Sequence, residues 1–142
     1  MTKTQSMSIL LVEDDDVDVM NVKRAFQKSN ITNPLFVAGN GQEALDLLRG
    51  PRRAEMVHLP NLILLDLRMP KMSGIEFLRE LRADPELKKL IVVVLTTSDD
   101  EKDVLSAYNL NVAGYIIKPV TFDKFLQAMA TLNLYWTLSE IP

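Results

Sequence analysis

Four short apolar runs in this sequence of 142 residues are followed by, or end at, side chains suited to metal or phosphate chemistry. In chain order these side chains are Glu13 and Asp14, then Asp66, then Thr96, then Lys118. Carboxylates that lie close together repel each other, and a divalent cation relieves that repulsion. Magnesium prefers oxygen ligands and commonly takes one or two carboxylates together with waters and phosphate oxygens. Glu13, Asp14 and Asp66 are therefore predicted to form a magnesium site if the fold brings them together.

Asp66 suits a more specific role, that of a nucleophile. It interrupts the apolar stretch LILLDL, where an unpaired carboxylate would be costly. An aspartate can attack a phosphoryl group and become an aspartyl phosphate. The charge on the transferred group is stabilised by metal ions, cations and hydrogen-bond donors. In this interpretation Mg²⁺ and Lys118 offset the charge of Asp66, and the Thr96 hydroxyl donates a hydrogen bond.

Taken singly, the same residues allow plain structural interpretations. The EDDD segment at 13–16 could be a solvated turn that caps a helix, because acids favour helix N-termini, and Asp15 or Asp16 is expected to do so. Asp66 could be a buried turn residue, and Lys118 could be a surface lysine. Their joint placement at the ends of separate strands favours the phosphoryl site.

Strand and helix patterns alternate along the chain and would position these residues. Apolar runs predict strands at 8–12, 34–38, 61–67, 90–96 and 113–118. Helical patterns follow at 16–28, 41–50, 75–83, 98–110 and 121–136. Apolar runs without alternation indicate parallel strands covered on both faces. We expect an α/β fold with a doubly wound five-stranded parallel sheet of order 2-1-3-4-5, flavodoxin-like, with ligands bound at the carboxyl ends of its strands.

Individual residues also predict where the helices begin and end. The expected signals are Gly50 at the end of the second helix, Asp84 after the third, Ser98 or Asp99 at the start of the fourth and Thr121 at the start of the last.

Composition narrows the class of protein. The hydrophobic fraction of 47% and the charged fraction of 25% are typical of one globular domain. The net charge of −3 does not predict binding to nucleic acid. The absence of cysteine excludes disulfides and thiolate zinc sites, and His58, the single histidine, is expected to be a loop residue. We find no signal peptide or membrane span and expect a cytoplasmic protein.

The motifs together resemble the receiver domain of two-component response regulators, the CheY-like family. LLVEDD, LLDLRMPKMSG, VVVLTTS and GYIIKPV occur in the order and at the spacing of that family, over Ser8 to Ala130. The resemblance implies that Asp66 is the phosphoacceptor and that Glu13 and Asp14 are the acidic pair that holds Mg²⁺. It also implies that the backbone carbonyl of Arg68 is a metal ligand.

The resemblance assigns further roles around the site. Thr96 corresponds to the switch hydroxyl, Lys118 to the lysine that pairs with the phosphoryl group, and Tyr115 to the switch aromatic, whose ring turns inward on activation. Lys118 is expected to precede a cis peptide bond to Pro119. Arg68 and Ser98 occupy positions that tune phosphoryl lifetime in this family, and Arg68 could reach toward Glu13 when metal is absent.

The ends of the chain carry a looser resemblance. We expect an N-terminal tail at 1–7, a receiver domain at 8–131 and a C-terminal extension at 132–142, with no output domain. The loop at 51–60 and the Tyr135–Trp136 pair resemble the small regulators of cyanobacterial phytochromes. That likeness implies a light-sensing histidine kinase as partner and a homodimer through the side formed by the fourth and fifth helices. Tyr135 and Trp136 could instead pack onto their own domain.

The predicted function is a phospho-accepting switch, which catalyses only its own phosphorylation and dephosphorylation and is not a metabolic enzyme. One alternative is a protein-interaction domain that works without phosphorylation. Another is a magnesium-dependent phosphatase with an aspartate nucleophile. Such phosphatases usually carry a second aspartate two residues after the nucleophile, where this chain has Arg68.

Overall fold

The computed structural model describes residues 8–28, 31–97 and 101–118, together with 121, 123, 124 and 127. Its strands are β1 (Ile9–Val12), β2 (Leu35–Ala38), β3 (Leu62–Leu65), β4 (Ile91–Thr96) and β5 (Gly114–Ile117). They form one parallel sheet of order β2-β1-β3-β4-β5. The helices are α1 (Asp16–Lys28), α2 (Gly41–Arg49), the short 3-10 helix η1 (Arg53–Glu55), α3 (Gly74–Ala83) and α4 (Glu101–Asn109). The predicted fold class and strand order are confirmed.

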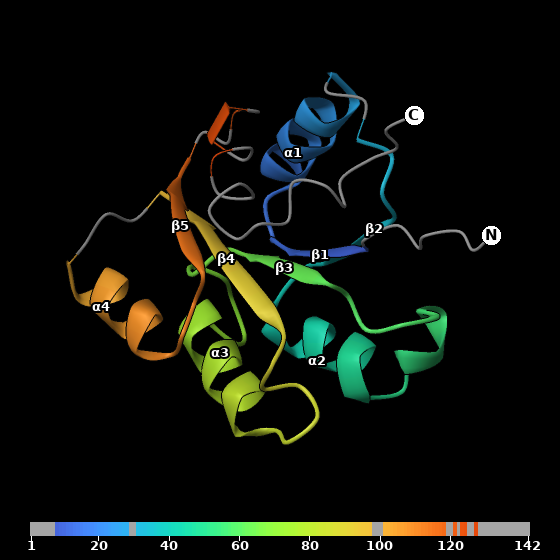
Figure 1. Cartoon of the computed structure of the whole chain (residues 1–142), viewed down its shortest axis with the longest axis vertical. Coiled ribbons are helices and arrows are strands. Elements are labelled where there is room, and N and C mark those ends of the chain that lie inside the picture. Colours follow the sequence, from blue (N-terminus) through green and yellow to red (C-terminus); the bar gives the residue numbers. More distant parts are fainter. Residues whose placement is uncertain are drawn as a thin grey trace.

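Helices cover both faces of this sheet (Figure 1). Figure 1 shows α1 on one side and α2 and α3 on the other. Successive strand residues alternate between the two apolar cores: Ile9 packs in the α1 core, and Leu10 packs in the core with α2 and α3. Because both faces are buried, the central strands are apolar at every position, which explains their continuous hydrophobic runs.

Most of the predicted helix ends are confirmed. Asp15 caps α1, since its Oδ1 accepts hydrogen bonds from the backbone N–H groups of Val17 (2.8 Å) and Asp18 (3.2 Å). Gly50 and Asp84 follow the last residues of α2 and α3 as expected. The Thr121 hydroxyl accepts from the backbone N–H of Lys124 at 3.2 Å, as a helix cap does. Ser98, Asp99 and most of the predicted last helix lie outside the described residues.

The start of α3 carries a signal that the sequence interpretation missed. Ser73 and Glu76 form a capping box, in which each side chain accepts a hydrogen bond from the backbone N–H of the other. The loop at 51–60 is also more ordered than expected, because it contains η1 and buries Met56. His58 is an exposed loop residue, as predicted. None of the helices in the described part of the chain is long and apolar enough to cross a lipid bilayer.

Arg82 ties α3 to the two segments that flank β4 and β5. Its guanidinium donates to the backbone carbonyls of Leu110 (2.7 Å), Lys88 (2.8 Å), Leu90 (2.8 Å) and Asn111 (3.0 Å). Hydrogen bonds from a charged donor are stronger than those between neutral groups. A side chain without these donors would leave several carbonyls, some of them partly buried, without their partner.

We expect Arg82→Met to lower the free energy of unfolding by about 2 kcal/mol, because the carbonyls lose a charged donor. Urea unfolding followed by circular dichroism measures this change. Arg79→Met is the matched control, since Arg79 is exposed on the same helix. Equal losses in the two variants would show that the carbonyl contacts contribute nothing specific.

Candidate functional site

The predicted site residues meet at the carboxyl edge of the sheet. Val12 and Leu65 are register partners in β1 and β3, so Glu13 and Asp66 follow neighbouring strands. Thr96 is the last residue of β4, and its carbonyl accepts a hydrogen bond from the backbone N–H of Lys118 at 2.9 Å. The parallel sheet thus gathers side chains that are far apart in the sequence.

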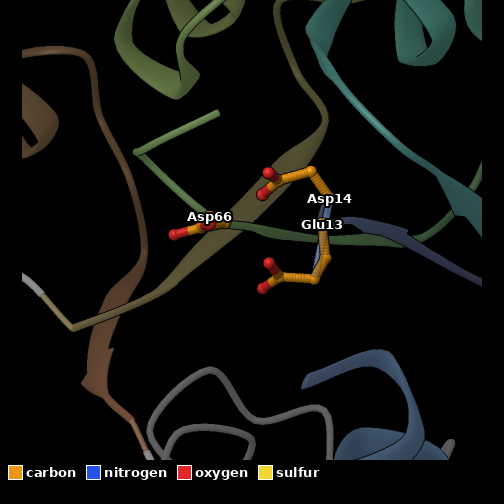
Figure 2. Close-up of side chains that lie close together, drawn as sticks. All are labelled: Glu13, Asp14 and Asp66. Carbon is orange, nitrogen blue, oxygen red and sulfur yellow. The ribbon is translucent and has the colours of Figure 1, made fainter. Parts of the chain in front are cut away.

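Three carboxylates form a cluster there. Glu13, Asp14 and Asp66 each offer one oxygen, and these oxygens lie within 4.8 Å of one another. Figure 2 shows the three side chains turned toward the same space beyond the strand ends. Glu13 and Asp66 are only 3% and 6% exposed, whereas Asp14 is exposed. An all-oxygen donor set of this kind fits Mg²⁺ or Mn²⁺.

Lys118 lies in the same pocket. Its Nζ is 2.6 Å from Glu13 Oε1, 2.7 Å from Asp18 Oδ2 and 3.7 Å from Asp66 Oδ2. The Lys118 side chain is 9% exposed, so the surface-lysine interpretation is wrong. The lysine does pair with Asp66, as expected, but its two hydrogen bonds go to Glu13 and Asp18.

Burial dominates the electrostatics of the pocket. Desolvation raises the pKa of Glu13 to about 7, with the charge of Asp66 adding to the rise and the Lys118 hydrogen bond opposing it. Desolvation also raises the pKa of Asp66, against the opposing charge of Lys118. Burial alone would lower the pKa of Lys118, but its bonds to Asp18 and Glu13 leave that pKa above its ordinary value. The carboxylates are therefore only partly compensated, and a divalent cation would relieve the rest.

Asp18 is the site residue that sequence reasoning missed. It lies in the first turn of α1, beyond the EDDD segment at 13–16 that the sequence analysis considered. The available signal is its place in the first turn of the helix that follows β1, close in sequence to Glu13 and Asp14.

Arg68 lies differently from expectation. Its guanidinium NH2 group is 2.8 Å from Asp103 Oδ2 on α4, so the predicted reach toward Glu13 is wrong. The carboxylate of Asp103 on α4 is an available acceptor, whereas Glu13 already binds Lys118. The proposed role of the Arg68 carbonyl as a metal ligand stays a prediction. Pro119 and Ser98 lie outside the described residues.

The two predicted switch residues differ in exposure. Thr96 is fully buried, and Tyr115 is half-buried in β5. The Tyr115 ring stacks on Tyr108 of α4, with ring centroids 6.4 Å apart and planes inclined by 27°. The structure thus links β5 to α4, while the switching roles of both residues stay predictions.

Gly74 allows α3 to begin close behind Asp66. A Cβ atom at this position would collide with the backbone carbonyl of Asp66 and lie 2.7 Å from the Cα of Leu67. The Gly74 N–H donates to the Leu67 carbonyl at 3.0 Å. Glycine is needed here because the backbones approach closely.

Comparison with known proteins decides the family. The model for the response regulator receiver domain matches residues 9–130. The chain belongs to the response regulator receiver domain family. It is thus a receiver domain of two-component signalling, a family of signalling modules rather than metabolic enzymes. The expected boundaries at 8 and 131 and the two flanking segments stay predictions.

Two curated relatives and two solved structures are informative. The chain is 38% identical to the probable methanogenesis regulatory protein FilR2 of Methanothrix harundinacea, over 90% of this chain and 82% of FilR2. It is also 38% identical to response regulator Rcp1 of Synechocystis, over 90% of this chain and 87% of Rcp1. The Mn²⁺-bound structure of Rcp1 matches with a TM-score of 0.75 and 37% identity, over 92% and 94% of the two chains. The phosphorylated cyanobacterial phytochrome response regulator RcpA matches with a TM-score of 0.77 and 35% identity, over 93% and 94%.

Proposed function

We propose that this receiver domain accepts a phosphoryl group on Asp66 from a sensor histidine kinase. The observation that carries the proposal is the convergence of Glu13, Asp14, Asp66 and Lys118 on one pocket. An Asp66 carboxylate oxygen attacks phosphorus, a P–O bond forms, and the bond from phosphorus to the histidine nitrogen of the donor breaks. No other co-reactant is needed, and slow attack by water returns the free carboxylate and inorganic phosphate.

The residues of the pocket have different roles in this transfer. Glu13, Asp14, Asp66 and the Arg68 carbonyl would hold Mg²⁺, which neutralises negative charge on the donor and acceptor oxygens when bound. Lys118 contributes a cation 3.7 Å from Asp66 Oδ2, and Thr96 supplies a hydroxyl at the end of β4. Mn²⁺ in the Rcp1 structure supports a divalent cation at this kind of site.

Phosphorylation would act as a switch. The added group carries about −1.5 to −2 charges and strong acceptor oxygens. Thr96 and Lys118 would move toward the phosphoryl group. Tyr115 is the register partner of Val94, two residues before Thr96, so a shift at the ends of β4 and β5 reaches the contact of Tyr115 with Tyr108 on α4. The switch would bias the surface formed by α4 and β5, where Leu105, Tyr108 and Ile117 are exposed apolar side chains.

We further propose that the donor is a phytochrome-type kinase in the cytoplasm and that two copies pair through the side of the domain that carries α4 and the predicted fifth helix. The likeness to RcpA, whose description names a phytochrome response regulator, supports the donor. The equal sequence identity to FilR2, a regulator of methanogenesis, is the reason to test the donor directly. Phosphotransfer from a purified phytochrome kinase, compared in red and far-red light, is that test.

The primary experiment incubates the protein with Mg²⁺ and acetyl phosphate and measures its intact mass. We expect the protein to gain the mass of one phosphoryl group. No gain is expected when EDTA is present during the incubation. Reduction with borohydride should then convert residue 66 to homoserine, which locates the acyl phosphate by peptide mass. Release of many phosphates per protein with no stable adduct would instead indicate a phosphatase. No adduct, and no binding of beryllofluoride, would leave a phosphorylation-independent interaction domain.

A further inference from the structure

Lys118 is shared between two sides of the pocket. Its ammonium has three N–H donors, and two of them are used at 2.6 Å to Glu13 and 2.7 Å to Asp18. Glu13 follows β1, beside Asp66, whereas Asp18 belongs to α1. Asp18 also lies outside the group of three carboxylates whose oxygens gather within 4.8 Å.

The ammonium lies close to the Asp66 carboxylate without forming a hydrogen bond to it. The distance from Lys118 Nζ to Asp66 Oδ2 is 3.7 Å, which is longer than a hydrogen bond. A phosphoryl group on Asp66 adds acceptor oxygens beside this ammonium, which already donates to Glu13 and Asp18. Glu13 is the neighbour of Asp66 at the strand ends, so its contact is compatible with a bond from Lys118 to the phosphoryl group. Asp18 lies on α1, and its carboxylate competes with the phosphoryl oxygens for the same ammonium.

We propose that Asp18 is a positioning residue that holds Lys118 toward α1 in the unphosphorylated protein and competes with the phosphoryl group for its ammonium. The inference rests on the proposed function of Asp66 as phosphoacceptor. Two effects act in the same direction. Asp18 stabilises Lys118 away from Asp66, and its negative charge repels an added anion in a partly buried pocket. Asp18 thereby lowers the fraction of phosphorylated protein that reaches the switched state.

Asp18→Asn isolates this effect, because asparagine keeps the shape and an acceptor oxygen but removes the charge. At saturating Mg²⁺, we expect beryllofluoride, a phosphoryl analogue, to bind about three to ten times more tightly than to the wild-type protein. Calorimetric titration measures this affinity, and a separate Mg²⁺ titration ensures saturation for each variant. Asp16→Asn is the matched control, since Asp16 is exposed in the same first turn and carries the same charge.

A second measurement tests the hydrogen bond between Lys118 and Asp18 without any phosphoryl analogue. In metal-free protein, acetylation of Lys118 by an amine-reactive reagent, followed by peptide mass, should be about three to ten times faster in Asp18→Asn. A loss of fold would also expose Lys118 and accelerate its acetylation, so thermal unfolding is measured in parallel. Asp18→Glu should restore slow acetylation and wild-type beryllofluoride affinity, since it restores the carboxylate.

The outcomes are distinguishable. Tighter beryllofluoride binding and faster Lys118 acetylation in Asp18→Asn, with neither in Asp16→Asn, support the inference. Unchanged or weaker binding, or equal changes in both variants, overturns it while leaving the proposed function intact. If the wild-type protein itself binds no beryllofluoride with Mg²⁺, the proposed function is overturned and the inference with it.

Discussion

Replacing Asp66 by asparagine should abolish phosphoryl uptake completely and at the same time stabilise the metal-free protein. The amide has the shape of the carboxylate but is not a nucleophile for phosphorus, so no acyl phosphate forms. Burial raises the pKa of Asp66, which shows that its charged form is unfavourable in the folded state. Removing that charge should raise the free energy of unfolding by about 1–2 kcal/mol near pH 8.

Intact mass after treatment with acetyl phosphate and urea unfolding measure the two effects. Their opposite signs separate a lost nucleophile from a damaged fold, which would lose both function and stability. Asp46→Asn is the matched control, because Asp46 lies on α2 away from the pocket, and it should keep phosphoryl uptake. Uptake of one phosphoryl group by Asp66→Asn would contradict the assignment of the acceptor. A decrease in its stability would contradict the account of the buried charge.

The stability of the metal-free protein should decrease as the pH rises from about 5 to about 8. In the unfolded chain Glu13 titrates near its ordinary pKa of 4.5, and in the folded protein its pKa is about 7. Between these values the folded protein keeps a proton that the unfolded chain has lost, so raising the pH favours unfolding. The loss amounts to about 3 kcal/mol, and the raised pKa of Asp66 acts in the same direction.

Mg²⁺ should reverse this loss near neutral pH. Metal ligands bind in their deprotonated form, so the cation competes with the proton on Glu13 and binds weakly in acid. At a concentration one hundred times its dissociation constant, Mg²⁺ should add about 3 kcal/mol to the free energy of unfolding. Urea unfolding across pH, with Mg²⁺ and with EDTA, measures both effects. Glu13→Gln should flatten the pH dependence in EDTA, and an unchanged slope in that variant would contradict the role of Glu13.

Below about pH 4 the trend should reverse, because other carboxylates have lowered pKa values. Hydrogen bonds from Arg49 lower the pKa of Asp84, so the unfolded chain takes up a proton before the folded protein does. The stabilisation from this pair is present above the ordinary pKa of an aspartate and decreases in stronger acid. The metal-free protein is therefore expected to be most stable in mildly acidic solution.

Local patterns in the sequence were enough to predict the sheet and the position of the acidic pocket. The central strands are buried on both faces, which requires apolar residues at every position, and each polar residue directly after such a run falls at the carboxyl edge of a parallel sheet. Glu13, Asp66, Thr96 and Lys118 could be placed for this reason. The cap at Asp15 and the helix end at Gly50 depend on chemistry within a few residues and were likewise predictable.

Only the tertiary structure decided which charged groups meet. Whether Lys118 bonds to Asp66, Glu13 or Asp18, and whether Arg68 turns to Glu13 or Asp103, depends on distances between elements that are remote in the chain. Long cationic side chains can choose among several carboxylates in one pocket, and the choice follows from where each helix packs on the sheet. The sequence alone therefore determined the fold and the place of the acidic pocket, and the packing of α1 and α4 decided how its charges are paired.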